Sequence, residues 1–333
     1  MTSSPALELT RCPVCDGVES REIANAGAVR EEIEALWAFH TARLDAATPP
    51  ARLADRVAFS QRPPVRIVEC VECGLVFRNP RERAWELEAI YAGEAVEPEA
   101  LKALFATQRD AYRAQAARLA DVAGKDRGTG LEVGSYVGGF LAAAAEVGWE
   151  FEGLDVNEGA AAFARERGFT VTIGDLDVIG DERRFHAVAF WNCFDQLPDP
   201  RAAAARARRL LQPGGTIAIR VPNGGFYATL RPAMRGFLAP AVRALLAHNN
   251  LLTFPYRHGF TLSSLRRLLR AEGFDVVRAR GDTLVPIADE WTKRWAAIEE
   301  RAVKRLLRGL GVAGAEVMPW IEVYGVKTRD GSQ

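Results

Sequence analysis

Two pairs of cysteines carry the most specific chemical signal in this chain. Each pair has CxxC spacing and is followed closely by glycine, in CPVCDG and in CVECG; the four residues are Cys12, Cys15, Cys70 and Cys73. Two thiolates so spaced can bind one tetrahedral ion from a tight turn, and the glycine lets backbone amides turn toward the sulfurs. Two such turns leave no open position for water, so we expect a structural zinc ion; buried cysteines or a redox dithiol are the alternatives.

A glycine-rich turn, LEVGSYVGGF, occupies residues 131–140 between an expected strand and an expected helix. A dinucleotide needs G-x-G-x-x-G, so that its pyrophosphate can approach bare backbone at the middle glycine. Counted from Gly134, that middle position is Tyr136, which argues against a nicotinamide cofactor. S-adenosylmethionine (SAM) has no phosphate, and needs a turn that admits its methionyl part and a helix N-terminus near its carboxylate.

Acidic and amide side chains follow at the ends of the next expected strands. Asp155 ends the second strand, where a carboxylate would meet ribose hydroxyls, and Asp175 follows the third, where it could accept from an adenine amino group. Trp191 and Asn192 end the fourth strand, beside the same crevice of the sheet. Each residue alone is a weak signal, but the ordered set is much more specific.

The elements that must position these residues alternate between strand and helix from Gly130 onward. The strands include FEGLDV, FTVTIGD and FHAVAFWN, and a helix expected over 201–215 precedes a strand over 216–223. Such alternation implies a mostly parallel sheet with right-handed crossovers. We therefore predict an α/β domain at 128–333, with a lid or substrate segment at 224–258, after a zinc-binding module with a helical insertion at 1–80 and a helical bridge at 81–127.

Taken in order, these motifs resemble the class I SAM-dependent methyltransferases, and among them bacterial small-molecule enzymes with an N-terminal four-cysteine zinc module. The matching stretches are CPVCDG, CVECGLVFRNP, LEVGSYVGGFL, GLDVNEGAAAFARERG, FDQLPDP, LLQPGGTIAIRVPN and FTLSSLRRLLRAEGF. The resemblance implies a Rossmann-like sheet of seven strands beside a small zinc-ribbon-like module. Its last two strands, here Phe274–Arg280 and Ile321–Thr328, would form an antiparallel hairpin.

The resemblance also implies a cofactor site. Residues of the glycine turn would shape the methionine pocket, Asp155 would bind the ribose, and Asp175 with Leu176 would flank the adenine. The cofactor-binding residues expected in this way and from the strand ends are Glu132, Gly134, Ser135, Tyr136, Gly138, Asp155, Val156, Asp175, Leu176, Trp191 and Asn192.

The group that would accept a proton from the substrate is less clear. Many relatives read Glu-His-Leu after the fourth strand, whereas this chain has Asp195-Gln196-Leu197. The histidine often invoked near the substrate is therefore absent. Our candidates for the base are His258 and Tyr256, in or next to the lid segment, with packing as the alternative role for each.

The composition of the chain argues against nucleic acid and membrane as partners. The 333 residues include 43 Lys and Arg and 43 Asp and Glu, so the net charge is zero and nothing draws the whole chain to nucleic acid. No apolar run approaches the roughly 18 residues of a membrane span, and the N-terminal residues lack a signal-peptide pattern, so we expect a cytoplasmic protein.

We expect SAM-dependent methylation of a small molecule, such as a sugar, polyketide, glycan or other secondary metabolite, at oxygen rather than at carbon or nitrogen. Three alternatives stay open: a nicotinamide-dependent oxidoreductase, a zinc-ribbon interaction protein on an inactive methyltransferase scaffold, and an enzyme that methylates RNA or protein. The sequence leaves the oligomeric state open.

Overall fold

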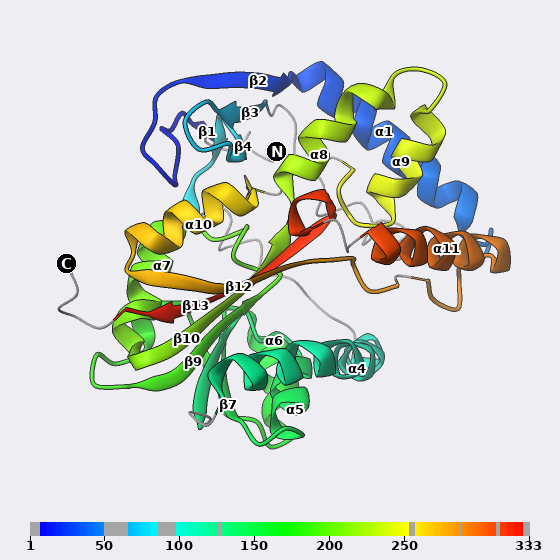
Figure 1. The fold of residues 1–333 in the computed structure, drawn as a ribbon. Coiled ribbons are helices and arrows are strands. Elements are labelled where there is room, and N and C mark those ends of the chain that lie inside the picture. Colours follow the sequence, from blue (N-terminus) through cyan, green and yellow to red (C-terminus); the bar gives the residue numbers. More distant parts are fainter. Residues whose placement is uncertain are drawn as a thin grey trace.

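A computed structural model describes residues 7–49, 66–85, 98–124, 128–252, 257–286, 288–310 and 314–328. Its centre is a seven-stranded sheet of order β12-β13-β10-β9-β6-β7-β8 (Figure 1). The strands are β6 (Thr129–Val133), β7 (Glu150–Asp155), β8 (Val171–Ile173), β9 (Phe185–Trp191), β10 (Leu211–Pro222), β12 (Phe274–Asp282) and β13 (Trp320–Lys327). Strand β13 runs antiparallel to both its neighbours, and the other pairs are parallel. The predicted fold class is confirmed.

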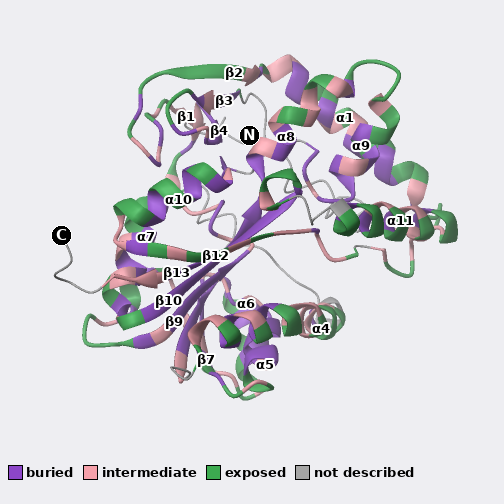
Figure 2. Cartoon of the chain, viewed as in Figure 1, coloured by how far each residue is buried: buried purple, intermediate pink, exposed green. Residues whose placement is uncertain are grey.

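Helices cover both faces of this sheet. The face toward α4 (Pro98–Ala123), α5 (Gly139–Ala145) and α6 (Glu158–Arg165) carries the small residues Ala187, Ala189 and Ala218. The face toward α7 (Pro200–Leu210) and α10 (Leu262–Ala271) carries larger ones, including Phe190 and Ile219. Because successive side chains alternate between faces, strands covered on both sides are apolar throughout. Strands β9, β10 and β13 are accordingly buried along most of their length (Figure 2).

The start of β10 differs from the prediction. The helix expected over 201–215 ends at Leu210, and the strand begins at Leu211 rather than at residue 216. Pro213 cannot continue a helix, because its ring clashes with the preceding turn and its nitrogen has no hydrogen to donate. The strand absorbs the QPGG stretch as an irregularity in its pairing with β9, between Leu211 and Thr216.

The N-terminal residues form small sheets beside the main one. They contain β1 (Leu7–Glu8), β2 (Ser20–Ala24), α1 (Ala26–Arg43), β3 (Ile67–Cys70), β4 (Val76–Arg78) and β5 (Arg81–Glu82). β1 pairs with β5, and a second sheet has the order β11-β4-β3-β2. Its edge strand β11 (His258–Gly259) comes from far along the chain, so the N-terminal strands are tied to the segment that precedes α10.

Much of the predicted lid segment 224–258 is helical. It contains α8 (Gly224–Leu230), the 3-10 helix η2 (Arg231–Met234) and α9 (Ala239–Ala247), and it shares a second apolar core with α1. A buried hydrogen bond of 2.9 Å from the Tyr227 hydroxyl to Glu32 links α8 to α1. Residues 253–256 of the segment lie outside the described residues.

The remaining elements are η1 (Leu176–Val178), α11 (Arg294–Leu310) and η4 (Ala315–Val317). Among the helices that the structure describes, none combines the length and the apolar character needed to cross a membrane.

Candidate active site and metal centre

The four cysteines of the CxxC pairs converge on one point. Their sulfur atoms all lie within 4.8 Å of one another. The Sγ atoms of Cys12 and Cys73 are 3.5 Å apart, and those of Cys15 and Cys70 are also 3.5 Å apart. In a tetrahedral zinc site with Zn–S bonds of about 2.3 Å, sulfurs are separated by about 3.8 Å. The cluster therefore has the size and the donor set of a closed four-thiolate metal site.

Tight backbone turns aim the sulfurs. The Cys12 N–H donates to the Gly17 carbonyl at 3.0 Å, and the Gly74 N–H donates to the Cys70 carbonyl at 2.9 Å. Gly74 has φ +72°, a conformation that glycine adopts without strain. A hydrogen bond from the Cys73 thiol lowers the pKa of Cys12 to about 5. The hydrogen bond with Cys12 raises the pKa of Cys73, and burial raises that of Cys15, so a metal ion would have to displace the protons of these two thiols.

This cluster is part of the molecule's largest core. Cys12, Cys70 and Cys73 are buried against the same apolar side chains as Phe260 and Leu265, which belong to the region of α10. Groups at the edge of the cluster also contact α10: the Arg267 guanidinium donates to the Glu72 carbonyl at 3.4 Å. The cysteines thus organise the junction between the N-terminal strands and the main domain.

The glycine turn leaves the carboxyl end of β6 and leads into α5. The N–H groups of Gly134 and Ser135 both donate to the Leu154 carbonyl, at 2.8 and 3.2 Å. Gly134, Tyr136 and Gly138 have φ values of +72°, +45° and +79°. A side chain at Gly134 would lie 3.0 Å from Cβ of Cys193, so this position combines a left-handed backbone with close packing. Tyr136 takes up a conformation that non-glycine residues rarely adopt.

Asp155 fastens that turn to the end of β7. Its Oδ2 accepts the Tyr136 N–H at 2.7 Å, and its Oδ1 accepts the Asn157 N–H at 2.9 Å. The side chain is mostly buried, and burial raises its pKa. The Tyr136 ring packs beside Val137 and Phe163, in a small apolar cluster that α4 completes.

Buried polar atoms without partners gather beside the turn. Within the described residues, Glu132 Oε2 and Ser135 Oγ have no hydrogen-bond partner. Burial, together with the charge of Asp155, raises the pKa of Glu132 well above its ordinary value. Buried polar groups are normally hydrogen-bonded, so these atoms mark a place where a polar ligand would complete the structure.

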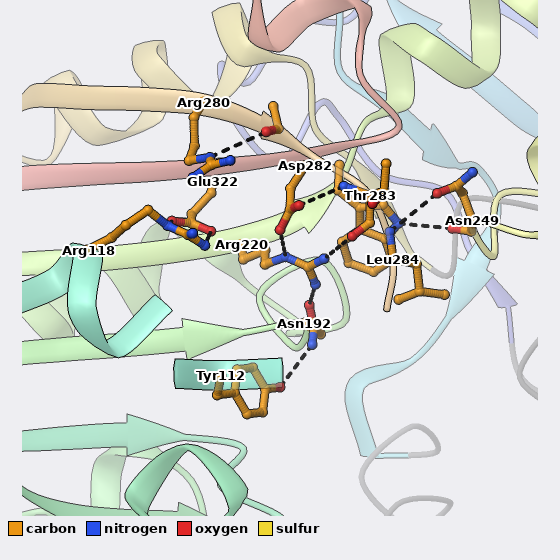
Figure 3. A network of polar contacts seen from close by, with 12 residues as sticks. Tyr112, Arg118, Asn192, Arg220, Asn249, Arg280, Asp282, Thr283, Leu284 and Glu322 are labelled. Atoms are coloured by element: carbon orange, nitrogen blue, oxygen red, sulfur yellow. Dashed lines mark hydrogen bonds and ion pairs between the residues drawn. The ribbon is translucent and has the colours of Figure 1, made fainter. Parts of the chain in front are cut away.

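Trp191 and Asn192, the two cofactor residues predicted at the end of β9, differ in their surroundings. Trp191 is part of the core, and Asn192 is part of a polar network. The Trp191 ring is buried against Phe140, with ring centroids 5.1 Å apart, so it forms part of the floor below the crevice. Asn192 donates from Nδ2 to the Tyr112 hydroxyl at 3.0 Å and accepts from Arg220 of β10 (Figure 3). Asn192 has φ +61°, which turns the chain sharply away from the strand.

The other predicted cofactor residues lie at the adjoining strand ends. Val156 is half-buried directly after β7, and the Asp155 carbonyl accepts the Gly174 N–H at 2.9 Å, which holds the start of the next loop alongside. Asp175 is exposed and caps η1, accepting the Asp177 N–H at 2.9 Å, while Leu176 is buried. The fold therefore brings the predicted set to one edge of the sheet.

Of the two candidate bases, only His258 lies among the described residues. Tyr256 lies outside the described residues. His258 is fully buried; its ring Nε2 lies 3.0 Å from the Leu197 carbonyl, and its backbone N–H donates to the Asp195 carbonyl at 3.0 Å. Burial, followed by the charges of Arg257 and Arg81, lowers the pKa of His258 well below its ordinary value. The imidazole is therefore neutral, and it braces the segment that follows β9.

Asp195 is the residue of greatest interest that sequence reasoning passed over as a candidate. Its side chain is fully buried, and neither carboxyl oxygen has a hydrogen-bond partner within the described part of the chain. Burial raises its pKa to about 8. The available signal was its place in Asp195-Gln196-Leu197, where relatives carry Glu-His-Leu, directly after the strand that ends at the crevice.

The known proteins whose sequences resemble this chain are methyltransferases. The family model described as a methyltransferase domain matches residues 105–279. A curated relative, the ubiquinone biosynthesis O-methyltransferase of Methylococcus capsulatus, is 27% identical over 171 residues, which are 48% of this chain and 69% of the relative.

Solved structures with a similar fold include a SAM-dependent methyltransferase of Thermotoga maritima, described as a possible histamine N-methyltransferase. It is 18% identical, with a TM-score of 0.46 over 74% of this chain and 100% of that one. A plantazolicin methyltransferase in complex with SAH (S-adenosylhomocysteine) is 13% identical, with a TM-score of 0.45 over 73% of this chain and 94% of that one.

Proposed function

This chain belongs to the methyltransferase domain family, and from that premise we propose that it transfers the methyl group of SAM to a hydroxyl oxygen of a small molecule. The acceptor is a sugar, polyketide, glycan or other secondary metabolite. The curated relative named above acts, by its description, as an O-methyltransferase, which supports oxygen over carbon or nitrogen. Family membership also favours a methyltransferase over the nicotinamide-dependent oxidoreductase considered from the sequence.

The buried polar atoms beside the glycine turn support the proposal that SAM binds here. Glu132 and Ser135 each offer an atom that has no partner among the described residues, and Asp155 lies at the neighbouring strand end. These residues would hold SAM, which supplies, when bound, a methyl group on a positively charged sulfur. Asp175 and Leu176, at the next strand end, would flank the adenine.

The chain's own contribution to the reaction is to position the acceptor, exclude water and accept a proton. A hydroxyl group loses its proton when its oxygen is methylated, and a base works best when its pKa lies near the operating pH. Asp195, with a pKa of about 8 in a fully buried position after β9, meets that condition. We propose it as a third candidate for the base, beside His258 and Tyr256.

His258 and Tyr256 remain alternative bases. Because its pKa is held well below the ordinary value, His258 would give a rate that does not change between pH 7 and 9. Asp195 would give a rate that rises toward pH 8 and then levels. The pH profiles of the wild type, of Asp195→Asn and of His258→Gln therefore decide between the two.

The four cysteines hold a structural zinc ion in this proposal. A site of four thiolates has no open coordination position, so the metal would take no part in methyl transfer. Its role is to fix the N-terminal strands, including β4, against β11 and α10. Those contacts support the segment that follows β9.

A ligand-stabilisation experiment tests the assignment. A ligand present at about 100 times its dissociation constant adds roughly 2.7 kcal/mol to the unfolding free energy. We expect S-adenosylhomocysteine to raise the melting temperature and NADH to leave it unchanged. Stabilisation by NADH alone would reverse the assignment in favour of an oxidoreductase. Stabilisation by neither would favour a zinc-ribbon interaction protein on an inactive scaffold.

A further inference from the structure

Arg257 is a buried cation whose guanidinium group has no hydrogen-bonding partner among the described residues. It directly precedes β11, and its carbonyl accepts the Arg78 N–H at 3.2 Å. The residue is 2% exposed, and none of its three guanidinium nitrogens donates a hydrogen bond to any group in the described residues. A buried guanidinium normally has several such partners, so this one requires an explanation.

Other arginines already pair with the described carboxylates near Arg257. Arg78 pairs with Glu82 at 3.1 Å, and Arg81 pairs with Glu8 at 3.0 Å. Arg257 lies farther from a carboxylate: its Nη2 is 4.0 Å from Oε1 of Glu8. Arg81 already pairs with that carboxylate. Arg257 itself therefore has no close carboxylate partner among the described residues.

This buried charge is unfavourable in the free protein. Burial, followed by the charge of Arg81, lowers the pKa of Arg257 to about 10, which still leaves the group charged at neutral pH. A buried charge without a full partner costs several kcal/mol. The planar guanidinium can donate two parallel hydrogen bonds to a carboxylate or a phosphate, and such a pair would give this charge a partner.

The position of this cluster relates it to the proposed site. Arg81 donates to the Pro198 carbonyl at 3.4 Å, and His258, next to Arg257, contacts the Leu197 carbonyl. Both carbonyls belong to the segment that leaves the carboxyl end of β9 and contains Asp195. Ligands of open α/β sheets bind outside the carboxyl ends of the strands. Arg81 and the neighbour of Arg257 thus contact the segment that leads from β9 toward the proposed acceptor site.

We propose that Arg257, assisted by Arg81, binds an anionic group of the methyl acceptor, a carboxylate or a phosphate. This inference rests on the proposed function for the identity of the ligand, but the binding of the anion itself does not depend on it. An acceptor without an anionic group would leave the guanidinium as unsatisfied as it is in the free protein.

Isothermal titration calorimetry with small anions tests the proposal. Sodium pyrophosphate and sodium succinate are titrated separately at constant ionic strength into the full-length, zinc-loaded protein. The variants are Arg257→Met, Arg257→Lys and, as a matched control, Arg267→Met, which alters a half-exposed arginine of α10. S-adenosylhomocysteine binding is measured for each protein to report folding of the main domain.

We expect wild-type protein to bind one of the two anions at millimolar concentration or below, and the anion that binds identifies phosphate or carboxylate as the recognised group. Arg257→Met should weaken this binding by at least about tenfold, since a hydrogen bond to a charged group contributes roughly 1.5–3 kcal/mol. Arg257→Lys should bind with intermediate affinity, and Arg267→Met should match the wild type.

The inference would be overturned if wild type and Arg257→Met bound the anion equally well. It would also be overturned if wild-type protein bound S-adenosylhomocysteine but neither anion. Both results would leave the proposed function intact. Wild-type protein that bound an anion but not S-adenosylhomocysteine would instead contradict the proposed function. If Arg257→Met fails to fold, the comparison of Arg257→Lys with Arg267→Met decides: equal anion affinity in those two variants contradicts the proposal.

Discussion

The Asn192 side chain joins Tyr112 to the sheet: its Nδ2 donates to the Tyr112 hydroxyl at 3.0 Å. The same side chain accepts from Arg220, whose guanidinium also donates to the Thr283 carbonyl at 3.0 Å and pairs with Asp282 at 3.3 Å (Figure 3). One amide at the end of β9 therefore links α4 to β10 and to the loop after β12. These elements border the proposed cofactor site, so its shape depends on this network.

Asn192→Ala should destabilise the protein by about 2–3 kcal/mol, because it leaves donors without acceptors and places a Cβ-bearing residue at φ +61° without compensation. Asn192→Gly loses the same hydrogen bonds but tolerates that φ, so it should recover about 1 kcal/mol. Tyr112→Phe, which removes one hydrogen bond, should cost about 1 kcal/mol. Urea denaturation measures all three; equal losses for Ala and Gly would contradict the strain argument.

Metal removal should destabilise more than the N-terminal strands. Because three of the four cysteines share a core with α10, chelation of the metal should lower the melting temperature of the whole protein. Elemental analysis should find one zinc per chain in the wild type and less in Cys12→Ser. Cys193→Ser is the matched control, since Cys193 lies outside the cluster and donates to the Val133 carbonyl at 3.0 Å. An unchanged zinc content in Cys12→Ser would contradict the four-thiolate site.

Asp195 should make stability depend on pH in a defined direction. Its pKa rises from an ordinary 3.8 to about 8 on folding, so between these values the native state keeps a proton that the unfolded state has lost. The native protein should therefore lose stability as pH rises from about 4 to about 8, by up to about 1.4 kcal/mol per pH unit, and level off above. Asp195→Asn should lack this loss, and chemical denaturation at several pH values measures the difference.

The same substitution tests catalysis. Asp195→Asn should bind S-adenosylhomocysteine with wild-type affinity while slowing methyl transfer about 10²–10⁴-fold, the usual contribution of a general base. Wild-type activity should rise as the carboxylate forms near pH 8. An Asp195→Asn enzyme with full activity would return the role to His258 or Tyr256.

The fold was within reach of the sequence because periodicity and turn residues report local structure directly. The alternation after Gly130 and the CxxC turns follow from short stretches of sequence, whereas the antiparallel last strands were implied by the family resemblance. The early start of β10 was missed because Pro213 ended the helix sooner than the run of apolar residues implied. The pairing of β11 with β4 could not be foreseen, since it joins residues almost two hundred positions apart.

The site was harder to predict, because it depends on which polar groups find partners after folding. The sequence does not show that Asp195 and Arg257 are buried. What distinguishes them is burial without hydrogen bonds among the described residues, a property of the packed chain. Likewise, Trp191 ends the expected strand, but the alternation of faces turns its ring into the core.

Native mass spectrometry of the purified protein with S-adenosylhomocysteine tests the central claim most directly, with Asp155→Ala as the comparison. The account predicts that the wild-type protein carries one zinc ion and one S-adenosylhomocysteine per chain. It also predicts that Asp155→Ala retains zinc and loses the nucleoside, because that carboxylate accepts the Tyr136 N–H that shapes the turn. A wild-type protein that binds no S-adenosylhomocysteine, or an Asp155→Ala variant that binds it equally well, would contradict the account.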